Sequence, residues 1–387
     1  TFMVARIMEA KLTLCCYKKE RRMVKGKQVI LKKEALKDFV TEVFKKLGVD
    51  SSDARIVADI LVAADLKGIS SHGISRLKRY VDGIKTGSIE PGAKIKVVKE
   101  TPVSALIDGG NGLGQVVAYK AMKKCIEIAE KAGVGFVGVR NSNHFGIAGY
   151  YSAMALEKNM VGISLTNARS SVAPTFGVEP VLGTNPISVA VPTGGPFPFV
   201  LDMATSIIQR GKLEVLEREN EEMLSGWAID ERGNILANPK KVTKDIVTGK
   251  AALLPLGGLG EEFGGHKGYG LGLLVDIFCA CFTGANFGLH LSRFKKGGYN
   301  LGHFFGAIKV ELFRPLDEFK KTIDSMFKEI KGSKKLPGKK RIYIAGEKEF
   351  ETENRRKKEG VPISLQLFEY MNSLKDTLEI ERFDIEP

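Results

Sequence analysis

The stretch Asp108-Gly-Gly-Asn-Gly-Leu-Gly114 decides the fold class, because it places a glycine-rich turn between a predicted strand and a predicted helix. A Rossmann turn needs the pattern G-x-G-x-x-G and an acidic residue about 20 positions later, at the end of the next strand. Here Gly110, Gly112 and Gly114 give G-x-G-x-G, and Glu130 falls inside the following helix. The sequence therefore predicts a tight or mobile loop that could contact a substrate, and not the dinucleotide fingerprint of a Rossmann domain.

Strands and helices alternate on both sides of this loop, as they do in βαβ units. Short apolar runs predict strands, and apolar residues at helical spacing predict helices. Strands are expected at 103–107, 134–139, 161–166, 187–191, 199–201 and 307–312, and helices at 115–131, 150–158, about 204–223, 271–282, 316–330 and 361–374. The middle of the chain is therefore expected to be mixed α/β.

The amino-terminal part of the chain has a helical pattern. An apolar stripe covers 32–47, and Ser51-Ser52-Asp53 caps a second helix that ends near Leu66-Lys67-Gly68. A third stripe begins at Leu77, which places His72 in the turn before a helix. Residues 1–29 are interpreted as a weakly specified leader without an assigned function.

Composition and length describe an ordinary globular α/β protein. The chain has 387 residues, more than the roughly 250 to 300 at which one core stops growing, so two lobes are expected. It has no apolar run near the roughly 18 residues that span a bilayer, no secretory signal and no paired cysteine framework. Cys279-x-Cys281 lacks metal-ligand spacing, so no metal site is expected. These features favour a cytoplasmic protein with free thiols.

The formal net charge of +14 favours anionic partners. The densest basic runs, 334–341 and 355–358, lack stacking aromatic side chains apart from Tyr343, just beyond the first run. A solvated face is the preferred interpretation of these runs. Binding of RNA or another polyanion is kept as the alternative, but neither nucleic acid nor a membrane is the expected partner.

Three of the five histidines lie beside glycines in short polar turns: Ser71-His72-Gly73, Asn143-His144-Phe145-Gly146 and Gly265-His266-Lys267-Gly268. Imidazole titrates near neutral pH and glycine lets a ligand approach the backbone, so the combination suits proton transfer beside a bound molecule. Each histidine alone could equally be a hydrogen-bonded turn residue. Three such turns in one chain favour a catalytic site.

Arg76 follows His72 by about one helical turn, so both side chains can face one ligand. This pair suits an α-oxo acid, because the guanidinium can hold the carboxylate while the imidazole gives a proton to the oxo group. The alternative is that Arg76, with Lys78 and Arg79, belongs to a solvated helix face. His144 closes a predicted strand, where α/β proteins bind ligands, and competes with His72 for the proton.

Two further segments suit a cofactor. Within 264–270, backbone N–H groups at a helix start and the charge of Lys267 could bind a phosphate. Gly268 stands where a nucleotide-hydrolysing loop needs serine or threonine, so hydrolysis is not expected. Asp202, at the end of a predicted strand, could accept a hydrogen bond from a ribose hydroxyl or cap the helix that follows.

Taken together, these strings resemble the type-2 malate/L-lactate dehydrogenase family of NAD(P)-dependent oxidoreductases, which also includes sulfolactate, ureidoglycolate, diketogulonate and cyclic-imine carboxylate enzymes. The resemblance runs from residue 35 to 362. It rests on Ala64-Asp-Leu-Lys-Gly-Ile-Ser-Ser-His-Gly73 with Arg76, Arg140-Asn-Ser-Asn-His-Phe-Gly146, Leu182-Gly-Thr-Asn-Pro186, Leu201-Asp-Met-Ala-Thr-Ser206 with Gly211-Lys212, and Gly268-Tyr-Gly-Leu271. Segment 282–302 departs most from the family pattern.

The resemblance implies roles for particular residues. His72 becomes the catalytic acid/base, Arg76 with Ser71 binds the substrate, and His144 lies close to the reacting carbon. The implied cofactor contacts are Phe199, Val200, Leu201, Asp202, Met203, Ala204, Thr205, His266, Lys267, Gly346, Glu347 and Lys348. The cofactor would be NAD or NADP, and the sequence does not choose between them.

The resemblance also implies the architecture and the reaction. A central, non-Rossmann, mixed-sheet α/β domain at 103–314 would bind the cofactor, and 30–102 with 315–387 would form a discontinuous helical domain. A homodimer would help to close the site. The reaction would be reversible hydride transfer between NAD(P) and a small 2-hydroxy/2-oxo acid, with malate/oxaloacetate or lactate/pyruvate favoured. Reduction of a cyclic imine carboxylate is the alternative within the family.

Overall fold

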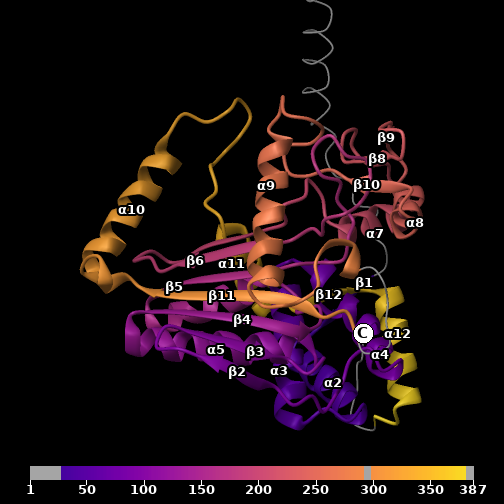
Figure 1. Ribbon diagram of the computed structural model, residues 1–387, viewed down its shortest axis with the longest axis horizontal. Coiled ribbons are helices and arrows are strands. Elements are labelled where there is room, and N and C mark those ends of the chain that lie inside the picture. Colours follow the sequence, from indigo (N-terminus) through magenta and orange to yellow (C-terminus); the bar gives the residue numbers. More distant parts are fainter. Residues whose placement is uncertain (1–27, 292–297, 381–387) are drawn as a thin grey trace, which may run out of the picture.

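The centre of the molecule is a seven-stranded sheet with the order β2-β3-β4-β11-β5-β6-β7 (Figure 1). The structure is a computed structural model that describes residues 28–291 and 298–380, so most of the expected leader lies outside it. The strands are β2 (Lys96–Glu100), β3 (Ser104–Asp108), β4 (Val134–Ser142), β5 (Met160–Thr166), β6 (Ile187–Val191), β7 (Phe199–Met203) and β11 (Leu301–Lys309).

The pairing of these strands differs from that of a doubly wound sheet. Among the described strands of this sheet, β3 and β4 run parallel, joined by α5 (Gly114–Ala132), and the other neighbours pair antiparallel. A parallel pair needs such a crossover, whereas antiparallel neighbours do not. β11 lies between β4 and β5, so a late segment occupies the middle of the sheet. The predicted non-Rossmann α/β class is confirmed.

Both ends of the described chain build a helical lobe beside the sheet. α2 (Lys33–Lys46), α3 (Ser51–Leu66) and α4 (Leu77–Lys85) share an apolar core with α12 (Leu365–Thr377). Figure 1 shows the early, indigo helices beside the yellow end of the chain. β1 (Gln28–Leu31) pairs with β12 (Val361–Ser364) and joins the two ends.

Two predictions at these ends are wrong. Residues 28 and 29 belong to strand β1 and not to the leader. The helix expected over 361–374 begins only at Leu365, since 361–364 form β12 and the Ser364 hydroxyl accepts from the N–H of Leu367 at the helix start. A further helix, α11 (Glu347–Glu359), precedes β12.

A small lobe follows β7 in the sequence. It consists of α7 (Arg210–Glu219), α8 (Pro239–Thr248) and a three-stranded sheet in the order β10-β8-β9 (Ala251–Leu253, Ala228–Asp230 and Ile235–Leu236). The prediction of one helix over 204–223 is wrong, because α7 covers only Arg210–Glu219 and 204–209 is a bent segment outside any helix. Its Thr205 and Ile207 N–H groups donate to the carbonyls of Thr184 and Leu254 instead of to a helix.

The remaining helices lie along the sheet and beyond it. They are α6 (Ala148–Met154), α9 (Gly265–Asp276) and α10 (Leu316–Gly332), with shorter turns η2 (Ser70–His72), η3 (Ile74–Arg76), η4 (Ala155–Lys158), η5 (Ile277–Cys281), η6 (Gly288–Leu291) and η7 (Val310–Leu312). α9 starts at Gly265 and not at 271, because Gly264 adopts a left-handed conformation that turns the chain into the helix. No helix within 28–291 and 298–380 has the length and apolarity needed to cross a membrane.

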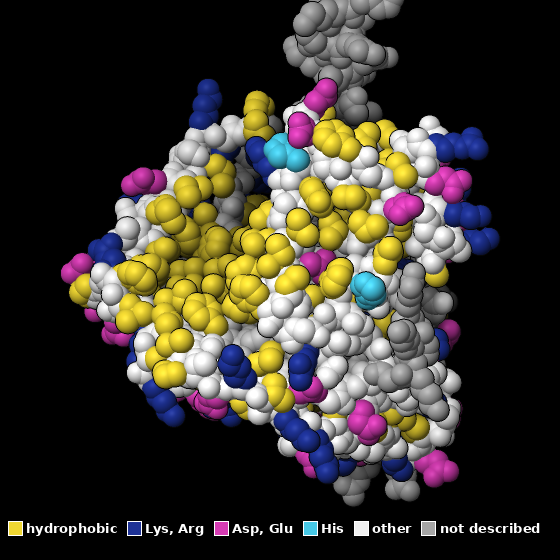
Figure 2. Space-filling view, viewed as in Figure 1, with side chains coloured by type: hydrophobic (Ala, Val, Ile, Leu, Met, Phe, Trp, Pro, Cys, Tyr) yellow, Lys and Arg dark blue, Asp and Glu magenta, His cyan; other side chains and the backbone are white. Residues whose placement is uncertain are grey.

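One face of the molecule between α9 and α10 is strongly apolar. Figure 2 shows hydrophobic side chains gathered there, with a hollow beside α10. We call this the apolar face; its exposed members are Leu273, Leu274, Ile277, Phe282, Phe313, Met326 and Ile330. The hollow has a volume of about 470 Å³ and lies between α10 and the end of β11.

Candidate active site

A cavity of about 610 Å³ opens where the helical lobe, the central sheet and the small lobe meet. Its size is in the range of small-molecule sites. His72 and Arg76 line it from the helical lobe, His144 from the sheet, and Arg210 from α7 of the small lobe. The structure therefore brings together the three residues predicted to do the chemistry, although they come from distant parts of the sequence.

The His72 turn lies between α3 and α4 as two short 3₁₀ turns, η2 and η3. The buried carboxylate of Asp65, near the end of α3, accepts a 2.7 Å hydrogen bond from the N–H of Ile74. A Cβ on Gly73 would overlap this carboxylate, which explains the glycine after His72. Burial raises the pKa of Asp65 to about 7. Asp65 therefore fixes the turn that carries His72 and Arg76.

α11 supports the same turn from the other end of the chain. The Arg356 guanidinium donates to the carbonyl of Asp65, and Lys67 pairs with Glu353 at 2.7 Å. The basic run at 355–358 is thus partly structural, since Lys357 also pairs with Glu353 and Arg355 with Glu359. These contacts favour the solvated-face interpretation of that run over a polyanion site.

Arg76 is held by two neighbours. Its Nε donates to the carbonyl of Ser71 at 2.6 Å, and Nη1 and Nη2 reach the two carboxylate oxygens of Glu214 at 3.2 and 3.0 Å. The Arg76 side chain is 17% exposed, so the interpretation of Arg76 as part of a solvated face is wrong. Glu214 lies on α7, in the segment predicted as a longer helix, and no sequence signal linked it to Arg76.

The two site histidines stack on each other, with ring centroids 5.7 Å apart and an interplanar angle of 21°. Ser71 Oγ lies 3.0 Å from His72 Nδ1, and Tyr80 Oη lies 2.6 Å from His144 Nδ1. The N–H of Gly146 also donates to His144 Nδ1, at 3.4 Å. An N–H donor requires an unprotonated Nδ1, so neutral His144 carries its proton on Nε2 and Tyr80 donates.

The cavity keeps both imidazoles neutral. Burial, followed by the charges of Arg76 and Arg79, lowers the pKa of His72 to about 4. Burial and the charge of Arg79 lower the pKa of His144 well below its ordinary value. Perturbed pKa values of this kind are common at functional sites. Since nearby charges contribute to them, the binding of a charged ligand can change the pKa again.

The glycine-rich loop that decided the fold class packs behind His144. Asn143 Nδ2 donates to the carbonyls of Asn111 and Gly112, at 3.1 and 2.9 Å. A Cβ on Gly114 would overlap the backbone carbonyls of Asn143 and His144. Of the two predicted forms, tight or mobile, the loop is therefore tight, and its glycine permits α5 to start directly against the His144 turn.

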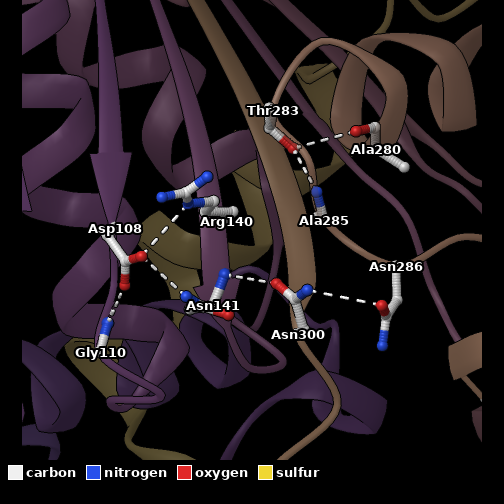
Figure 3. A network of polar contacts seen from close by, with 9 residues as sticks. All are labelled: Asp108, Gly110, Arg140, Asn141, Ala280, Thr283, Ala285, Asn286 and Asn300. Atoms are coloured by element: carbon white, nitrogen blue, oxygen red, sulfur yellow. Dashed lines mark hydrogen bonds and ion pairs between the residues drawn. The ribbon is translucent and has the colours of Figure 1, made fainter. Parts of the chain in front are cut away.

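A polar network ties this loop to Asn300, just before β11 (Figure 3). Asp108 accepts from the Gly110 N–H at 3.0 Å, from Arg140 Nε at 3.2 Å and from Asn141 Nδ2 at 2.7 Å. The Asn141 N–H donates to Asn300 Oδ1 at 2.7 Å. Asp108 thus links β3, β4 and the segment before β11, which leads to the cavity residues Tyr299 and Leu301.

His303 was missed by sequence reasoning. It is fully buried on β11 between Thr166 Oγ1 at 2.8 Å and Ser142 Oγ at 2.7 Å. Thr166 donates to the carbonyls of Asn167 and Gly302, so His303 Nδ1–H donates to Thr166, and Ser142 donates to Nε2. Its ring stacks on Phe145 at 4.7 Å, next to His144. Burial lowers the pKa of His303 to about 3, so it acts as a neutral support.

Three more guanidinium groups line the cavity: Arg79, Arg169 and Arg210. Burial, followed by repulsion from Arg169, lowers the pKa of Arg210. Arg169 Nε is buried without a hydrogen-bond partner within the described part of the chain. Glu214 and Asp82 are the carboxylates among the described lining residues. The cavity therefore has an excess of positive charge. The sequence pattern placed Arg79 on a helix face and did not single out Arg169 or Arg210.

Two of the three predicted cofactor segments lie side by side. The N–H of Val200 on β7 donates to the carbonyl of Ala345 at 3.2 Å, and a Cβ on Gly346 would press on Val200 and Pro198. The Glu347 carboxylate, in contrast, is buried against Lys331 at 2.6 Å and the Ile344 N–H at 3.0 Å. Glu347 thus shapes the loop that precedes Lys348 and is not free to bind a ligand through its carboxylate.

The third segment is the start of α9. His266 and Lys267 are exposed there and lie outside the lining of the described cavity. α9 joins the rest of the site further along, where Asp276 accepts from Asn167 Nδ2 at 3.2 Å and Asn185 Nδ2 at 3.0 Å. Asp202 caps α6, not the segment that follows it, because its carboxylate accepts from the N–H of Gly149 at 2.7 Å.

A non-Rossmann α/β sheet carries two stacked neutral imidazoles beside a group of guanidinium side chains, which suits proton transfer next to an anionic ligand. A family model described as malate/L-lactate dehydrogenase matches residues 31–372, and the chain belongs to this family. It is a dehydrogenase of the 2-hydroxy-acid type, as the motifs predicted.

Relatives and solved structures agree over almost the whole chain. A malate dehydrogenase of Pyrococcus abyssi is 49% identical over 366 residues, which cover 95% of this chain and 99% of the relative. An L-sulfolactate dehydrogenase of Methanocaldococcus jannaschii is 42% identical, with 90% and 96% covered. A crystal structure of malate dehydrogenase from Entamoeba histolytica superposes with a TM-score of 0.90 at 44% identity, with 92% and 99% covered.

Proposed function

We propose that this enzyme transfers a hydride reversibly between NAD or NADP and a small 2-hydroxy acid that carries a second acidic group, with malate/oxaloacetate as the first candidate. The observation that supports this proposal is the cavity in which His72 and His144 face four guanidinium groups. Lactate/pyruvate is the second candidate of the sequence prediction. It has one carboxylate and would leave most of these cations without an anion.

The charge balance of the cavity supports the diacid. Arg76 already has Glu214 as a partner, whereas Arg79 and Arg210 have no ion-pair partner within the described residues. Guanidinium groups bind carboxylates and sulfonates strongly when water is excluded. A substrate with two anionic groups can neutralise both the Arg76 end and the Arg79–Arg210 side. The malate and sulfolactate dehydrogenases among the relatives carry names of such diacids.

His72 is proposed to hold and move the proton. In the reduction direction it gives a proton to the oxygen of the oxo group, while Arg76 and the backbone near Ser71 orient the carboxylate. Because burial and the charges of Arg76 and Arg79 lower its pKa to about 4, His72 is neutral at pH 7. The anionic substrate offsets the charges of Arg76 and Arg79, so binding raises the pKa of His72 and lets it take up the proton that it donates.

His144 is proposed to orient the oxo group. Because Tyr80 and Gly146 both donate to its Nδ1, neutral His144 offers an Nε2–H donor. This group can stabilise negative charge on the substrate oxygen, as donors in other enzymes do. His144 remains the alternative proton carrier, since it stacks on His72 in the same cavity.

Residues 199–205 and 346–348 are proposed to hold a nicotinamide dinucleotide, with Glu347 shaping the loop and not binding through its carboxylate. The Val200–Ala345 contact brings 199–205 and 346–348 together, and the close approach of Gly346 to Val200 leaves no room for a side chain. The N–H groups at the start of α9 and the ammonium of Lys267 suit a phosphate. When bound, the nicotinamide accepts or supplies the hydride. The choice between NAD and NADP stays open in this proposal.

A homodimer is proposed from the apolar face between α9 and α10. Exposed apolar patches of this kind mark interaction surfaces, and a second copy of the chain is the expected occupant. Sedimentation of the purified protein as a single dimeric species would support the homodimer, and a stable monomer at micromolar concentration would contradict it. A cytoplasmic location also stays a prediction.

A spectrophotometric screen tests the reaction. Oxaloacetate, 3-sulfopyruvate, pyruvate and a cyclic imine carboxylate would each be offered with NADH and with NADPH. We expect the highest kcat/KM with a substrate that carries two anionic groups. Faster turnover of the imine would support the family alternative. Salt-dependent RNA binding with no thermal stabilisation by either cofactor would favour the polyanion alternative instead.

A further inference from the structure

We propose that Glu214 occupies the place on Arg76 that the substrate carboxylate takes, and that Glu214 leaves Arg76 when the acid binds. Glu214 thereby sets the affinity of the enzyme for its acid substrate. The inference rests on the proposed function, since it takes Arg76 as the carboxylate-binding residue.

Glu214 occupies the hydrogen-bond donors of Arg76 that a substrate carboxylate would need. A guanidinium offers five N–H groups arranged as two forks, one between Nη1 and Nη2 and one that includes Nε. Glu214 closes the first fork with both carboxylate oxygens, at 3.2 and 3.0 Å. The carbonyl of Ser71 takes Nε at 2.6 Å, so the second fork is incomplete. A substrate carboxylate can make a two-pronged contact with Arg76 only if Glu214 moves away.

The position of α7 explains why Glu214 reaches Arg76. Gly211, in the first turn of α7, packs so closely on the His72 turn that an added Cβ would meet Arg76 Nη2 and the Ser71 Cβ. Glu214 follows Gly211 by three residues and Arg210 by four, so all three lie on one face of the helix. The same face lines the cavity. Glu214 is therefore an internal anion of the substrate site, contributed by the small lobe.

Burial and charge show that this ion pair can open. The Glu214 side chain is 44% exposed, so its carboxylate can turn to water without a large desolvation change. Ion pairs that are this exposed are weak. The small lobe has its own apolar core around Leu213, Leu216 and Val242, which does not depend on the ion pair. An incoming carboxylate would regain the same fork on Arg76 and would add contacts with the other guanidinium groups.

The test is the substitution E214Q, which keeps the size of the side chain and removes its charge. We expect the KM for oxaloacetate to fall about two- to fivefold, with kcat and the affinity for NADH unchanged, because a weak, partly exposed pair no longer competes. The matched control is E217Q on the same helix, whose exposed carboxylate lies outside the lining of the cavity. E217Q is expected to leave the KM unchanged.

A calorimetric titration with oxalate gives a second measurement that needs no hydride transfer. E214Q should bind oxalate about two- to fivefold more tightly than the wild type, and the gain should disappear when Arg76 is replaced by alanine in the same chain. A higher KM and weaker oxalate binding in E214Q would mean that Glu214 orients Arg76 for the substrate. That result, or no change at all, would overturn the inference.

The two proposals fail in different ways. If the wild type transfers hydride to none of the oxo acids, the proposed function fails, while the oxalate titration still reports whether Glu214 and an acid compete for Arg76. If the wild type is active and E214Q shows an unchanged or raised KM, the proposed function stands and only the role of Glu214 is lost.

Discussion

The His72 turn and the His144 turn face the same cavity but are held in different ways. The His144 turn is enclosed by backbone and rings: Gly114 packs against its carbonyls, and the Phe145 ring stacks between Tyr151 and His303 at 4.7 Å on each side. The His72 turn depends on side-chain contacts, chiefly the Asp65 carboxylate and the Arg76–Glu214 ion pair. We call the His144 turn the fixed wall of the cavity, because backbone and ring packing hold it. We call the His72 turn the adjustable wall, because side-chain contacts that can change hold it.

This difference suggests a division of roles. A proton carrier must change its protonation state during the reaction, so a site whose charged neighbours rearrange on binding suits it. His72 has such neighbours, since burial and then the charges of Arg76 and Arg79 lower its pKa, and an acid would offset both charges. His144 is fixed by Tyr80, which keeps one tautomer. The comparison therefore supports the proposal that His72 carries the proton and that His144 orients the oxo group.

The largest expected effect comes from removing the His72 imidazole. His72→Ala should lower kcat by roughly 10² to 10⁴, the range for a lost general acid, and should leave the affinity for NADH nearly unchanged. Steady-state kinetics of oxaloacetate reduction and NADH titration by fluorescence measure the two quantities. Wild-type turnover in this variant would move the proton to His144 and remove the division of roles.

The next effect concerns substrate binding on the adjustable wall. Arg76→Ala should raise the KM for the oxo acid about 10- to 100-fold, because charge-assisted hydrogen bonds of this kind contribute roughly 1.5 to 3 kcal/mol. The value of kcat should change much less. Lys78→Ala is the control, since Lys78 is exposed and pairs with Asp82 on the same helix. An unchanged KM in Arg76→Ala would mean that another guanidinium binds the carboxylate.

Gly114 tests how firmly the His144 turn is held. Gly114→Ala should lower the free energy of unfolding by about 1 to 3 kcal/mol, because the new Cβ meets the backbone of Asn143 and His144, which cannot rotate away. Gly73→Ala should cost less, since the three atoms nearest to its Cβ belong to a side chain, that of Asp65, and Gly73 has a negative φ of −88°.

Gly270→Ala on α9 provides the matched control for these glycine variants. Among the residues that the structure describes, no atom outside the neighbouring backbone of α9 lies within 4 Å of a Cβ at this position, so alanine should stabilise the helix slightly. Denaturant unfolding gives the free energy of unfolding of each of the three variants, and thus the order of their stabilities. A Gly73 variant that is less stable than the Gly114 variant would reverse the comparison between the two walls.

The sequence predicted the parts of the site that are local in the chain. His72, Arg76 and His144 lie at the ends of helices and strands whose patterns are clear, so their meeting at one cavity could be expected. Glu214 could not be found in this way, because it reaches Arg76 from 138 positions away, through a lobe whose short strands carry weak patterns. Arg79 is exposed, as the solvated-face interpretation expected, but it also lines the cavity, which a helical stripe alone does not show.

His303 also depends on contacts between distant parts of the chain. The strand that carries it, β11, was expected at 307–312 but covers Leu301–Lys309, because β4 and β5 pair with it on both sides and extend it. A histidine in a strand with buried neighbours carries no sign of its partners, which lie 137 and 161 positions away. Pairing between distant segments, and not local preference, decides these features.

The smallest expected effect is a pH dependence that distinguishes the two histidines. Since the pKa of His72 is about 4 and rises when an acid offsets Arg76 and Arg79, binding should take up protons. Affinity for oxalate should then fall as pH rises from about 4 toward the raised pKa of the complex, by at most tenfold per pH unit, and should level off above it. Calorimetry in two buffers with different ionisation enthalpies counts the protons. His72→Asn should abolish the uptake, whereas uptake that persists there and disappears in His144→Asn would exchange the roles of the two walls.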